Sequence, residues 1–369
     1  WRASSESGRG AGTAPPQSAG ESGMGEGALS VTTAVPAQAT NTAVPSPAPS
    51  RTARPSTTPS PSPAAAEQAV DTPTPVPTPT ADPYAAYTIE ALAARSYGGG
   101  GLEIVERLEL NDSFSRYLIT YPSDGLTIYG FMNVPHDGSK FPVAIVLHGY
   151  VDPAGYETLA YTTRYADMLA EAGYFAIHPN LRGFPPSDEG QDAYRTGLAA
   201  DVLNLIAIIR EQSSDPEGPL RRADPEAIHL WGHSMGGGVA LRVATVLNEP
   251  YLRAAVLYGA MSGDEQQNYE KILEWSGGNS GAFELAAPPQ ALQAISPLAH
   301  LERITTPLSI HHGDGDETVP PAWSADLCAR LAALERPGEC FTYHAAPHTF
   351  YGDWEALFYK RGLAFFVRD

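Results

Sequence analysis

The fold is decided by the stretch Ala227-Ile228-His229-Leu230-Trp231-Gly232-His233-Ser234-Met235-Gly236-Gly237-Gly238-Val239-Ala240. The residues before Gly232 favour a buried strand, and apolar residues recur at helical spacing from Val239 to Leu247. Ser234 therefore stands where a strand gives way to a helix. This placement is typical of a nucleophile elbow, in which a tight turn pushes the serine hydroxyl out of the sheet.

Two glycines and one amide complete this motif. Gly232 and Gly236 leave room for the strand and the helix to pass closely. The amide of Met235, in the first turn of the helix, is expected to point toward a developing oxyanion. The five-residue motif alone carries little weight in a glycine-rich chain. The strand before it and the helix after it favour the catalytic interpretation.

The composition changes sharply near Tyr84. Residues 1–83 are dominated by Ala, Ser, Thr, Pro and Gly, and include the run Thr72-Pro73-Thr74-Pro75-Val76-Pro77-Thr78-Pro79-Thr80. Such a segment cannot bury enough apolar surface to offset the entropy lost on ordering. We therefore expect a disordered tether over residues 1–83 and a catalytic domain over residues 84–369. A low-complexity tail without a role is the alternative.

The charge of the chain narrows the choice of partners. The net charge of −19 disfavours nucleic acid and anionic lipid. No run of about 18 apolar residues is present, so we expect no transmembrane span. The chain opens on Trp1 and its first thirty residues lack the apolar core of a secretory signal, while the composition of the expected tether favours export. We expect a secreted or surface-tethered protein whose upstream signal has already been removed.

The first part of the domain reads as a short helix and three strands. Thr88 is the expected N-cap of a helix over residues 88–95. Two of the strands are joined through Asp124-Gly125, which is a strong hairpin signal. Antiparallel strands should therefore begin the sheet. The three expected strands cover residues 102–108, 114–121 and 126–134.

After Pro142 strands and helices alternate. Repeated strand-helix units imply a doubly wound, mostly parallel sheet with its active site at the carboxyl ends of the strands. Residues 260–305 interrupt the alternation and are expected to form a small helical lid. Strands are expected at 143–147, 174–177, 227–231, 254–258, 308–310 and 341–343, and helices at 161–172, 192–211, 322–334 and 354–367.

The chain has two cysteines, Cys328 and Cys340. A disulfide that closes this short loop and a pair of buried free thiols both fit the sequence. With no further cysteine nearby, a thiolate metal site is unsupported.

A serine nucleophile needs a base, and the base needs an orienting acid, in the chain order Ser, acid, His. Asp316 is the expected acid, because it lies well into the loop that follows the strand at 308–310. Asp314 is the second candidate, since an Asp at a turn start often caps backbone amides, and Glu317 is the third. A calcium site made of these three carboxylates has too few ligands in sequence.

The expected base is His348, in the loop between the last strand and the last helix. His344 is the runner-up, and the other histidines, including His233, are interpreted as structural. The second oxyanion amide should be that of Tyr150, because Gly149 lets the backbone approach the site. A turn without a catalytic role is the alternative there.

Together these residues resemble the α/β-hydrolase superfamily. From about Phe114 to the C-terminus the chain is similar to the catalytic domain of the prolyl oligopeptidase family and to its esterase relatives, including acetyl xylan esterase and dienelactone hydrolase-like proteins. The resemblance implies Ser234, Asp316 and His348 as a catalytic triad. The residues that carry it are 125–130, 147–149, 180–183, 232–236, 296–297, 312–320 and His348.

The chain departs from these relatives in two ways. No blade-length repeat precedes the hydrolase-like part, whereas prolyl oligopeptidases carry a β-propeller there. Dienelactone hydrolases use a cysteine where this chain has Ser234. We therefore expect a serine carboxylesterase acting on a small-molecule ester or a short peptide, without a cofactor or a metal. A serine peptidase and a catalytically silent binding protein are the alternatives.

Overall fold

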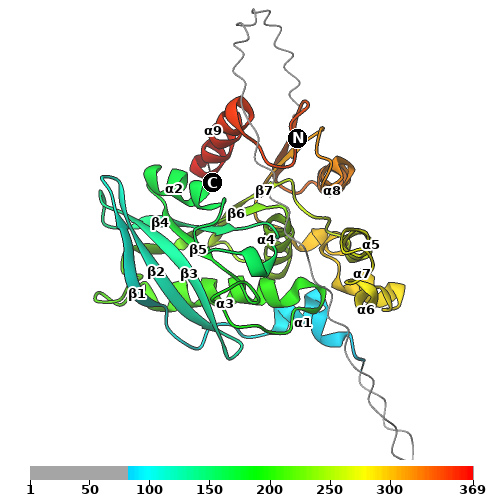
Figure 1. The fold of residues 1–369 in the computed structure, drawn as a ribbon, viewed down its shortest axis with the longest axis horizontal. Helices are drawn as coiled ribbons and strands as arrows, with labels where there is room; N and C mark the ends of the chain where they lie inside the picture. The colour runs from blue at the N-terminus through cyan, green and yellow to red at the C-terminus, as the bar shows by residue number, and fades with distance from the viewer. Residues whose placement is uncertain (1–81, 369) are drawn as a thin grey trace, which may run out of the picture. The chain divides into compact units, whose positions relative to one another are not determined.

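The computed structural model describes residues 82–368 (Figure 1). The tether expected over residues 1–83 lies outside the described residues except for Asp82 and Pro83. The first described helix is α1 (Ile89–Ala94), and the Thr88 hydroxyl accepts a hydrogen bond of 3.1 Å from the Ala91 amide. The prediction of Thr88 as an N-cap is thus confirmed. None of the described helices is long and apolar enough to cross a membrane.

A nine-stranded sheet forms the centre of the domain, in the order β1-β2-β3-β5-β4-β6-β7-β8-β9. The ladders from β1 to β5 through β2 and β3 are antiparallel, and the other ladders are parallel. The mostly parallel sheet with antiparallel N-terminal strands is therefore confirmed. The strands are β1 (Glu103–Leu110), β2 (Phe114–Ser123), β3 (Leu126–Pro135), β4 (Phe141–Leu147), β5 (Phe175–Pro179), β6 (Ala223–His233), β7 (Leu252–Tyr258), β8 (Leu308–Gly313) and β9 (Gly338–Tyr343).

The predicted hairpin turn joins β2 to β3. Ser123 pairs with Leu126 across the ladder, so Asp124 and Gly125 are the two turn residues. Their φ angles are 54° and 82°. Two consecutive left-handed residues are what a tight turn needs to match the twist of the strands.

Helices cover both faces of the sheet (Figure 1). The helices α2 (Thr163–Glu171) and α9 (Gly352–Arg368) pack on one face, and α3 (Thr196–Gln212), α4 (Met235–Val246) and α8 (Pro321–Ala333) pack on the other. Along β6 the side chains alternate between the two cores. Leu230 packs with the α3 and α4 side, while Trp231 packs with Phe358 of α9 at a ring-centroid distance of 4.8 Å.

The helix expected from residue 192 begins later, at Thr196. The residues before it, Tyr194 and Arg195, both have a φ of 55° and lie in the left-handed region. Their surroundings explain the change. The guanidinium of Arg195 forms an ion pair of 2.5 Å with buried Glu265, and the Tyr194 ring packs at 5.8 Å from that of Tyr269. These contacts offset a backbone strain of about 1–3 kcal/mol per residue.

The segment over residues 260–305 is helical and lies between β7 and β8. It contains α5 (Glu265–Trp275), α6 (Ala282–Leu285) and α7 (Pro289–Ile295), which appear beside one another in yellow in Figure 1. These helices have a small core of their own. They are tied to α4 by the buried ion pair between Glu265 and Arg242.

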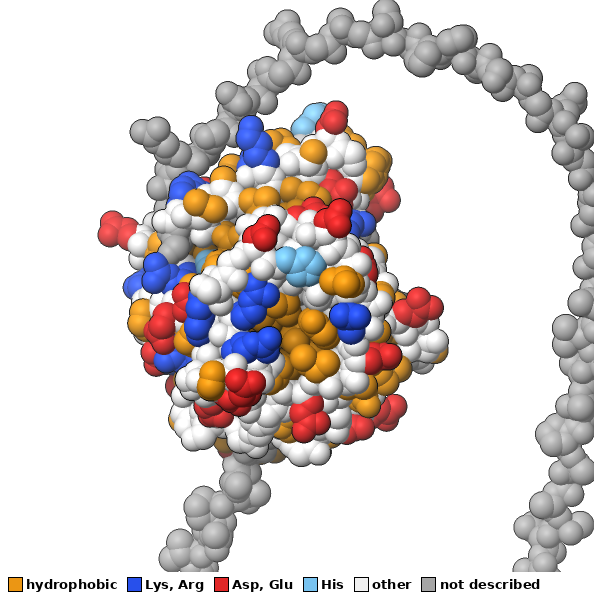
Figure 2. Space-filling model, turned by 90° about the vertical axis from the view of Figure 1, so that its left-hand side faces the viewer, with side chains coloured by type: hydrophobic (Ala, Val, Ile, Leu, Met, Phe, Trp, Pro, Cys, Tyr) orange, Lys and Arg blue, Asp and Glu red, His pale blue; other side chains and the backbone are white. Residues whose placement is uncertain are grey.

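Two further features involve the edge strands β9 and β1. Cys328 of α8 and Cys340 of β9 form a disulfide across a sequence separation of 12 residues. The edge strand β1 exposes apolar side chains, because Val105 and Leu110 are 52% and 61% accessible. From the side on which β1 lies, Figure 2 shows hydrophobic side chains gathered beside basic ones.

Candidate active site

Ser234 lies at the sharp turn between β6 and α4. Its φ of 54° and ψ of −116° are strained for a residue with a side chain. The two glycines of the motif are needed for packing. A Cβ on Gly232 would collide with the Gly236 carbonyl, and a Cβ on Gly236 would collide with the carbonyl of Leu147 in β4. The predicted close passage of strand and helix is therefore confirmed.

The serine opens into a pocket of about 850 Å³ at the carboxyl ends of the parallel strands. Met235, Tyr150 and His348 line the same pocket. Its walls are mainly apolar and aromatic, which is typical of a small-molecule site. The apolar walls include Phe184, Met261, Tyr269, Ile272 and Trp275, of which the last three come from α5.

Asp316 follows β8 and its side chain is 1% exposed. Oδ2 accepts hydrogen bonds from His348 Nδ1 at 2.7 Å and His312 Nε2 at 3.0 Å. Oδ1 accepts from the amides of Thr318 at 2.8 Å and Val319 at 2.9 Å. Burial raises the pKa of Asp316, but these hydrogen bonds outweigh it and hold the pKa below its usual value. The side chain is therefore a carboxylate at neutral pH.

His348 follows β9 and its side chain is 18% exposed. The Asp316 carboxylate occupies Nδ1, so Nε2 is the nitrogen left for the pocket. Among residues 82–368, no hydrogen bond engages this Nε2 or the Ser234 hydroxyl, and none joins the two groups. Gly259, at a φ of 49°, lets the backbone after β7 approach the imidazole.

The weaker candidates for the acid and the base, Asp314, Glu317 and His344, lie outside the pocket of Ser234. Asp314 pairs with His344 at 3.1 Å, and the side chain of His344 is 95% exposed. Glu317 is exposed as well. None of the three lines the pocket that contains Ser234. In the part of the chain that the structure describes, no group of three or more His, Cys, Asp or Glu is arranged to hold a metal ion.

The two expected oxyanion amides come from two separate segments of the chain. Met235 is the first residue of α4, so its amide has no carbonyl partner within the helix. Tyr150 lies in the loop after β4, and both residues line the pocket. The preceding amide, that of Gly149, donates to the Tyr161 hydroxyl at 2.9 Å. The next amide in the loop, that of Tyr150, has no hydrogen-bond partner among residues 82–368.

Several pocket residues carry no motif and were not predicted. Tyr161 precedes α2, Arg195 lies on the strained segment before α3, and Tyr269 and Trp275 lie on α5. For Tyr269 and Trp275 the one signal in the sequence is the presence of aromatic residues in the expected lid. That signal does not distinguish a pocket wall from a small core, since Tyr269 belongs to both.

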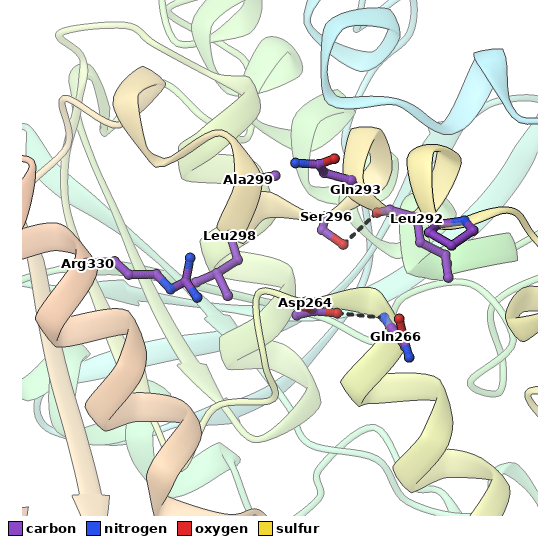
Figure 3. Close-up of a pocket in the computed structure, with 9 residues that line it drawn as sticks. Asp264, Gln266, Leu292, Gln293, Ser296, Leu298, Ala299 and Arg330 are labelled. Atoms are coloured by element: carbon purple, nitrogen blue, oxygen red, sulfur yellow. Dashed lines mark hydrogen bonds between the residues drawn. The ribbon is translucent and has the colours of Figure 1, made fainter.

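Another cavity, of about 310 Å³, lies among α5, α7 and α8 (Figure 3). It is lined by polar side chains such as Asp264, Gln293 and Arg330. The Ser296 hydroxyl in its wall is already engaged, because it donates to the Leu292 carbonyl and accepts from the Glu265 amide. None of the predicted site residues lines this cavity, so the larger pocket is the candidate active site.

Solved structures with this fold include peptidases and esterases. A puromycin-hydrolysing peptidase of Mycobacterium tuberculosis is 21% identical with a TM-score of 0.57, and the match covers 70% of this chain and 40% of that one. Acetyl xylan esterase 1 from Thermoanaerobacterium sp. JW/SL YS485 is 17% identical with a TM-score of 0.56. That match covers 76% of this chain and 93% of the esterase.

Sequence comparison gives the same grouping. The uncharacterized peptidase YtmA of Bacillus subtilis (strain 168) is 21% identical over 239 residues, which are 63% of this chain and 86% of that protein. The model of the prolyl oligopeptidase family matches residues 160–369, the part of the chain that carries the elbow and both of the following loops. With its α/β-hydrolase fold, the chain belongs to the prolyl oligopeptidase family.

Proposed function

We propose that this protein is a serine carboxylesterase that works through an acyl-enzyme. One observation carries the proposal: the strained serine at the elbow shares its pocket with an imidazole whose other nitrogen is held by a buried carboxylate. This is the order of groups that activates a serine hydroxyl. Ser234, His348 and Asp316 are the proposed nucleophile, base and orienting acid.

In the first half of the reaction, Ser234 Oγ attacks the ester carbonyl carbon and its proton passes to His348 Nε2. The Asp316 carboxylate accepts from Nδ1–H at 2.7 Å, so it fixes the tautomer with a free Nε2 and stabilises the imidazolium that forms. The amides of Met235 and Tyr150 donate to the oxyanion. Collapse of the tetrahedral intermediate returns the proton to the leaving alcohol and leaves the acylated serine.

In the second half, water attacks the acyl carbon while His348 Nε2 takes one of its protons. The same two amides stabilise the second oxyanion. Collapse releases the carboxylic acid, and the proton returns to Ser234 Oγ. Each step uses only groups of this chain, the ester and water.

Two observations support esters over peptides. Within residues 82–368 the nine strands form one sheet, so the described part contains no propeller that could admit and anchor a peptide. The mainly apolar pocket suits the acyl or alcohol part of a small ester.

We also propose that the protein is exported, because the Cys328–Cys340 disulfide is typical of an oxidising compartment. Mass spectrometry of protein recovered from the medium and from cell extract, after alkylation of free thiols, tests this. Disulfide-bonded protein in the medium is expected. Protein found in the cell extract alone, with both thiols alkylated, would contradict export.

The main experiment compares p-nitrophenyl esters of graded acyl length with peptide p-nitroanilides on the full chain. Ester turnover that exceeds anilide turnover is expected, and Ser234→Ala should lower kcat by about 10⁶-fold at unchanged melting temperature. A fluorophosphonate probe should label Ser234 in the folded protein. Comparable turnover of anilides would favour the peptidase, and absence of labelling would favour a silent binding protein.

A further inference from the structure

A chain of hydrogen bonds links the loop after β4 to the loop after β9. The Gly149 amide contacts the Tyr161 hydroxyl at 2.9 Å, and this hydroxyl contacts His233 Nδ1 at 2.8 Å. On the other side of the ring, His233 Nε2 contacts the His348 backbone carbonyl at 3.2 Å. The chain therefore begins beside the proposed oxyanion amide and ends on the proposed base.

The donors and acceptors in this chain allow one arrangement of protons. The Gly149 N–H can only donate, so the Tyr161 oxygen accepts from it. The His348 carbonyl can only accept, so His233 carries its proton on Nε2. His233 Nδ1 is then bare and accepts the proton that Tyr161 donates. Every group in the chain has a partner of the correct kind.

His233 is held firmly in this position. The residue is 2% exposed, and its ring packs against those of Tyr258 and His348 at centroid distances of 4.4 and 4.8 Å. Burial, followed by the proximity of His348, lowers the pKa of His233 to about 3. Burial also raises the pKa of Tyr161. Both side chains stay neutral near pH 7, so the arrangement of protons does not change.

We propose that Tyr161 and His233 are positioning residues that hold the oxyanion loop and the base loop in one fixed relation. With the Gly149 amide tied to Tyr161, the next amide, that of Tyr150, is left to face the oxyanion. Asp316 fixes the His348 ring at Nδ1, while His233 fixes the backbone of the same residue. This proposal rests on the proposed function and adds residues to it that touch no reacting atom.

The size of the effect follows from what these loops must do. A displacement of about 1 Å of a reacting group can cost about 100-fold in rate. Tyr161→Phe removes the hydroxyl and with it both of its hydrogen bonds. We expect kcat to fall by about 10- to 100-fold, with KM within about twofold, since substrate binding to the apolar walls is unchanged.

Two substitutions of His233 test its two hydrogen bonds separately. The amide of Asn reaches the place of Nδ1, so His233→Asn keeps the contact with Tyr161 and loses the contact with His348. The amide of Gln reaches the place of Nε2, so His233→Gln does the reverse. Each is expected to lower kcat. Tyr161→Phe should add less to His233→Gln, in which the contact between Tyr161 and residue 233 is already lost, than to His233→Asn, which keeps that contact.

Inhibition by phenylboronic acid distinguishes positioning from a general structural role. The tetrahedral adduct on Ser234 places an oxygen toward the oxyanion amides, so its affinity should fall in parallel with kcat/KM across the variants. Tyr156→Phe is the matched control. It removes one hydroxyl from the same loop region, whose single contact is Asn180 Oδ1 at 3.3 Å, and it should retain wild-type kcat and inhibition.

Two outcomes would overturn this proposal. One is a wild-type kcat in Tyr161→Phe and in both His233 variants. The other is a loss that appears only as a raised KM or a lowered melting temperature, with unchanged affinity for the boronate. Neither outcome touches the proposed function, whose failure would be seen as wild-type protein that neither turns over esters nor reacts with a fluorophosphonate.

Discussion

Two Asp–His pairs lie close together in this structure, and they differ in almost everything except their residue types. His348 Nδ1 lies 2.7 Å from Asp316 Oδ2, and His344 Nδ1 lies 3.1 Å from Asp314 Oδ2. In each pair the Asp comes from the loop after β8 and the His from the segment after β9. Proximity alone therefore does not identify a catalytic pair.

The difference lies in burial and in the remaining partners of the carboxylate. Asp316 is 1% exposed and accepts from another histidine and two backbone amides, whereas Asp314 is 44% exposed. In the buried pair the imidazole has a fixed direction and its free nitrogen faces the pocket of Ser234. Asp314 also accepts a hydrogen bond from the Ala345 amide, but water competes for its exposed carboxylate, so the exposed pair is weak.

The strongest test of this difference compares the two histidines. His348→Ala should lower kcat on an ester by about 10⁵-fold or more, because it removes the proposed base. His344→Ala should leave kcat within about twofold. Steady-state assays of both variants at equal concentrations of folded protein measure this. Similar losses in the two variants would remove the distinction between the pairs.

The next largest difference in kcat is expected between variants of Asp316 and Asp314. Asp316→Asn should lower kcat by about 10⁴-fold, because an amide can hold the wrong tautomer of His348. It should also cost about 2–3 kcal/mol of stability, since the buried donors lose a charged acceptor. Asp314→Asn should change neither quantity. Kinetics and urea unfolding test both claims, and a stable, active Asp316→Asn would contradict the assignment.

At acid pH the buried histidines should lower the free energy of unfolding, whereas the exposed ones should not. Burial lowers the pKa of His178, His233 and His311 to about 3. The unfolded chain takes up protons at these sites below about pH 6.5 and the folded chain does not, so the free energy of unfolding should fall from pH 6.5 toward pH 3. Urea unfolding at several pH values measures the slope.

Substitutions test the origin of this slope. His311→Gln should reduce it by about 1.4 kcal/mol per pH unit, the contribution of one proton. The exposed control, His344→Ala, should leave it unchanged. A free energy of unfolding that does not vary between pH 7 and pH 4 would show that the buried histidines are not neutral in the fold.

The smallest effect on activity is expected from the disulfide. Cys340 lies in β9, before the strand end from which His344 and His348 follow. Replacing Cys328 and Cys340 together by Ala should cost about 3 kcal/mol of stability, because a short loop is released in the unfolded chain. It should leave kcat unchanged. A large loss of kcat at a temperature where the variant is folded would show that the disulfide is needed for the geometry of the active site.

Much of the site was predictable because its signals are local. The glycines around Ser234, the strand before it and the helix after it all lie within one short stretch, and the turn at Asp124-Gly125 needs only two residues. Position in the loop also favours Asp316 over Asp314 as the acid. The structure gives it a physical reason, because only Asp316 is buried behind an imidazole that faces the pocket.

Other features were not predictable. Nothing near residue 192 indicates that Tyr194 and Arg195 adopt left-handed backbone, since the partner that explains it, Glu265, lies 70 residues away. The link from Gly149 through Tyr161 and His233 to His348 also joins four separate segments. The sequence predicts a place at the site for Gly149 and His348, but it indicates a structural role for His233 and gives no motif for Tyr161.

The sequence by itself determined the elbow at Ser234, the order of the strands and helices along the chain, and the hairpin turn, because each depends on neighbouring residues. The tertiary structure decided the order of strands in the sheet, the start of α3, and which Asp–His pair places its histidine in the pocket of the serine. These depend on burial and on contacts between distant segments, which form only when the whole chain has folded.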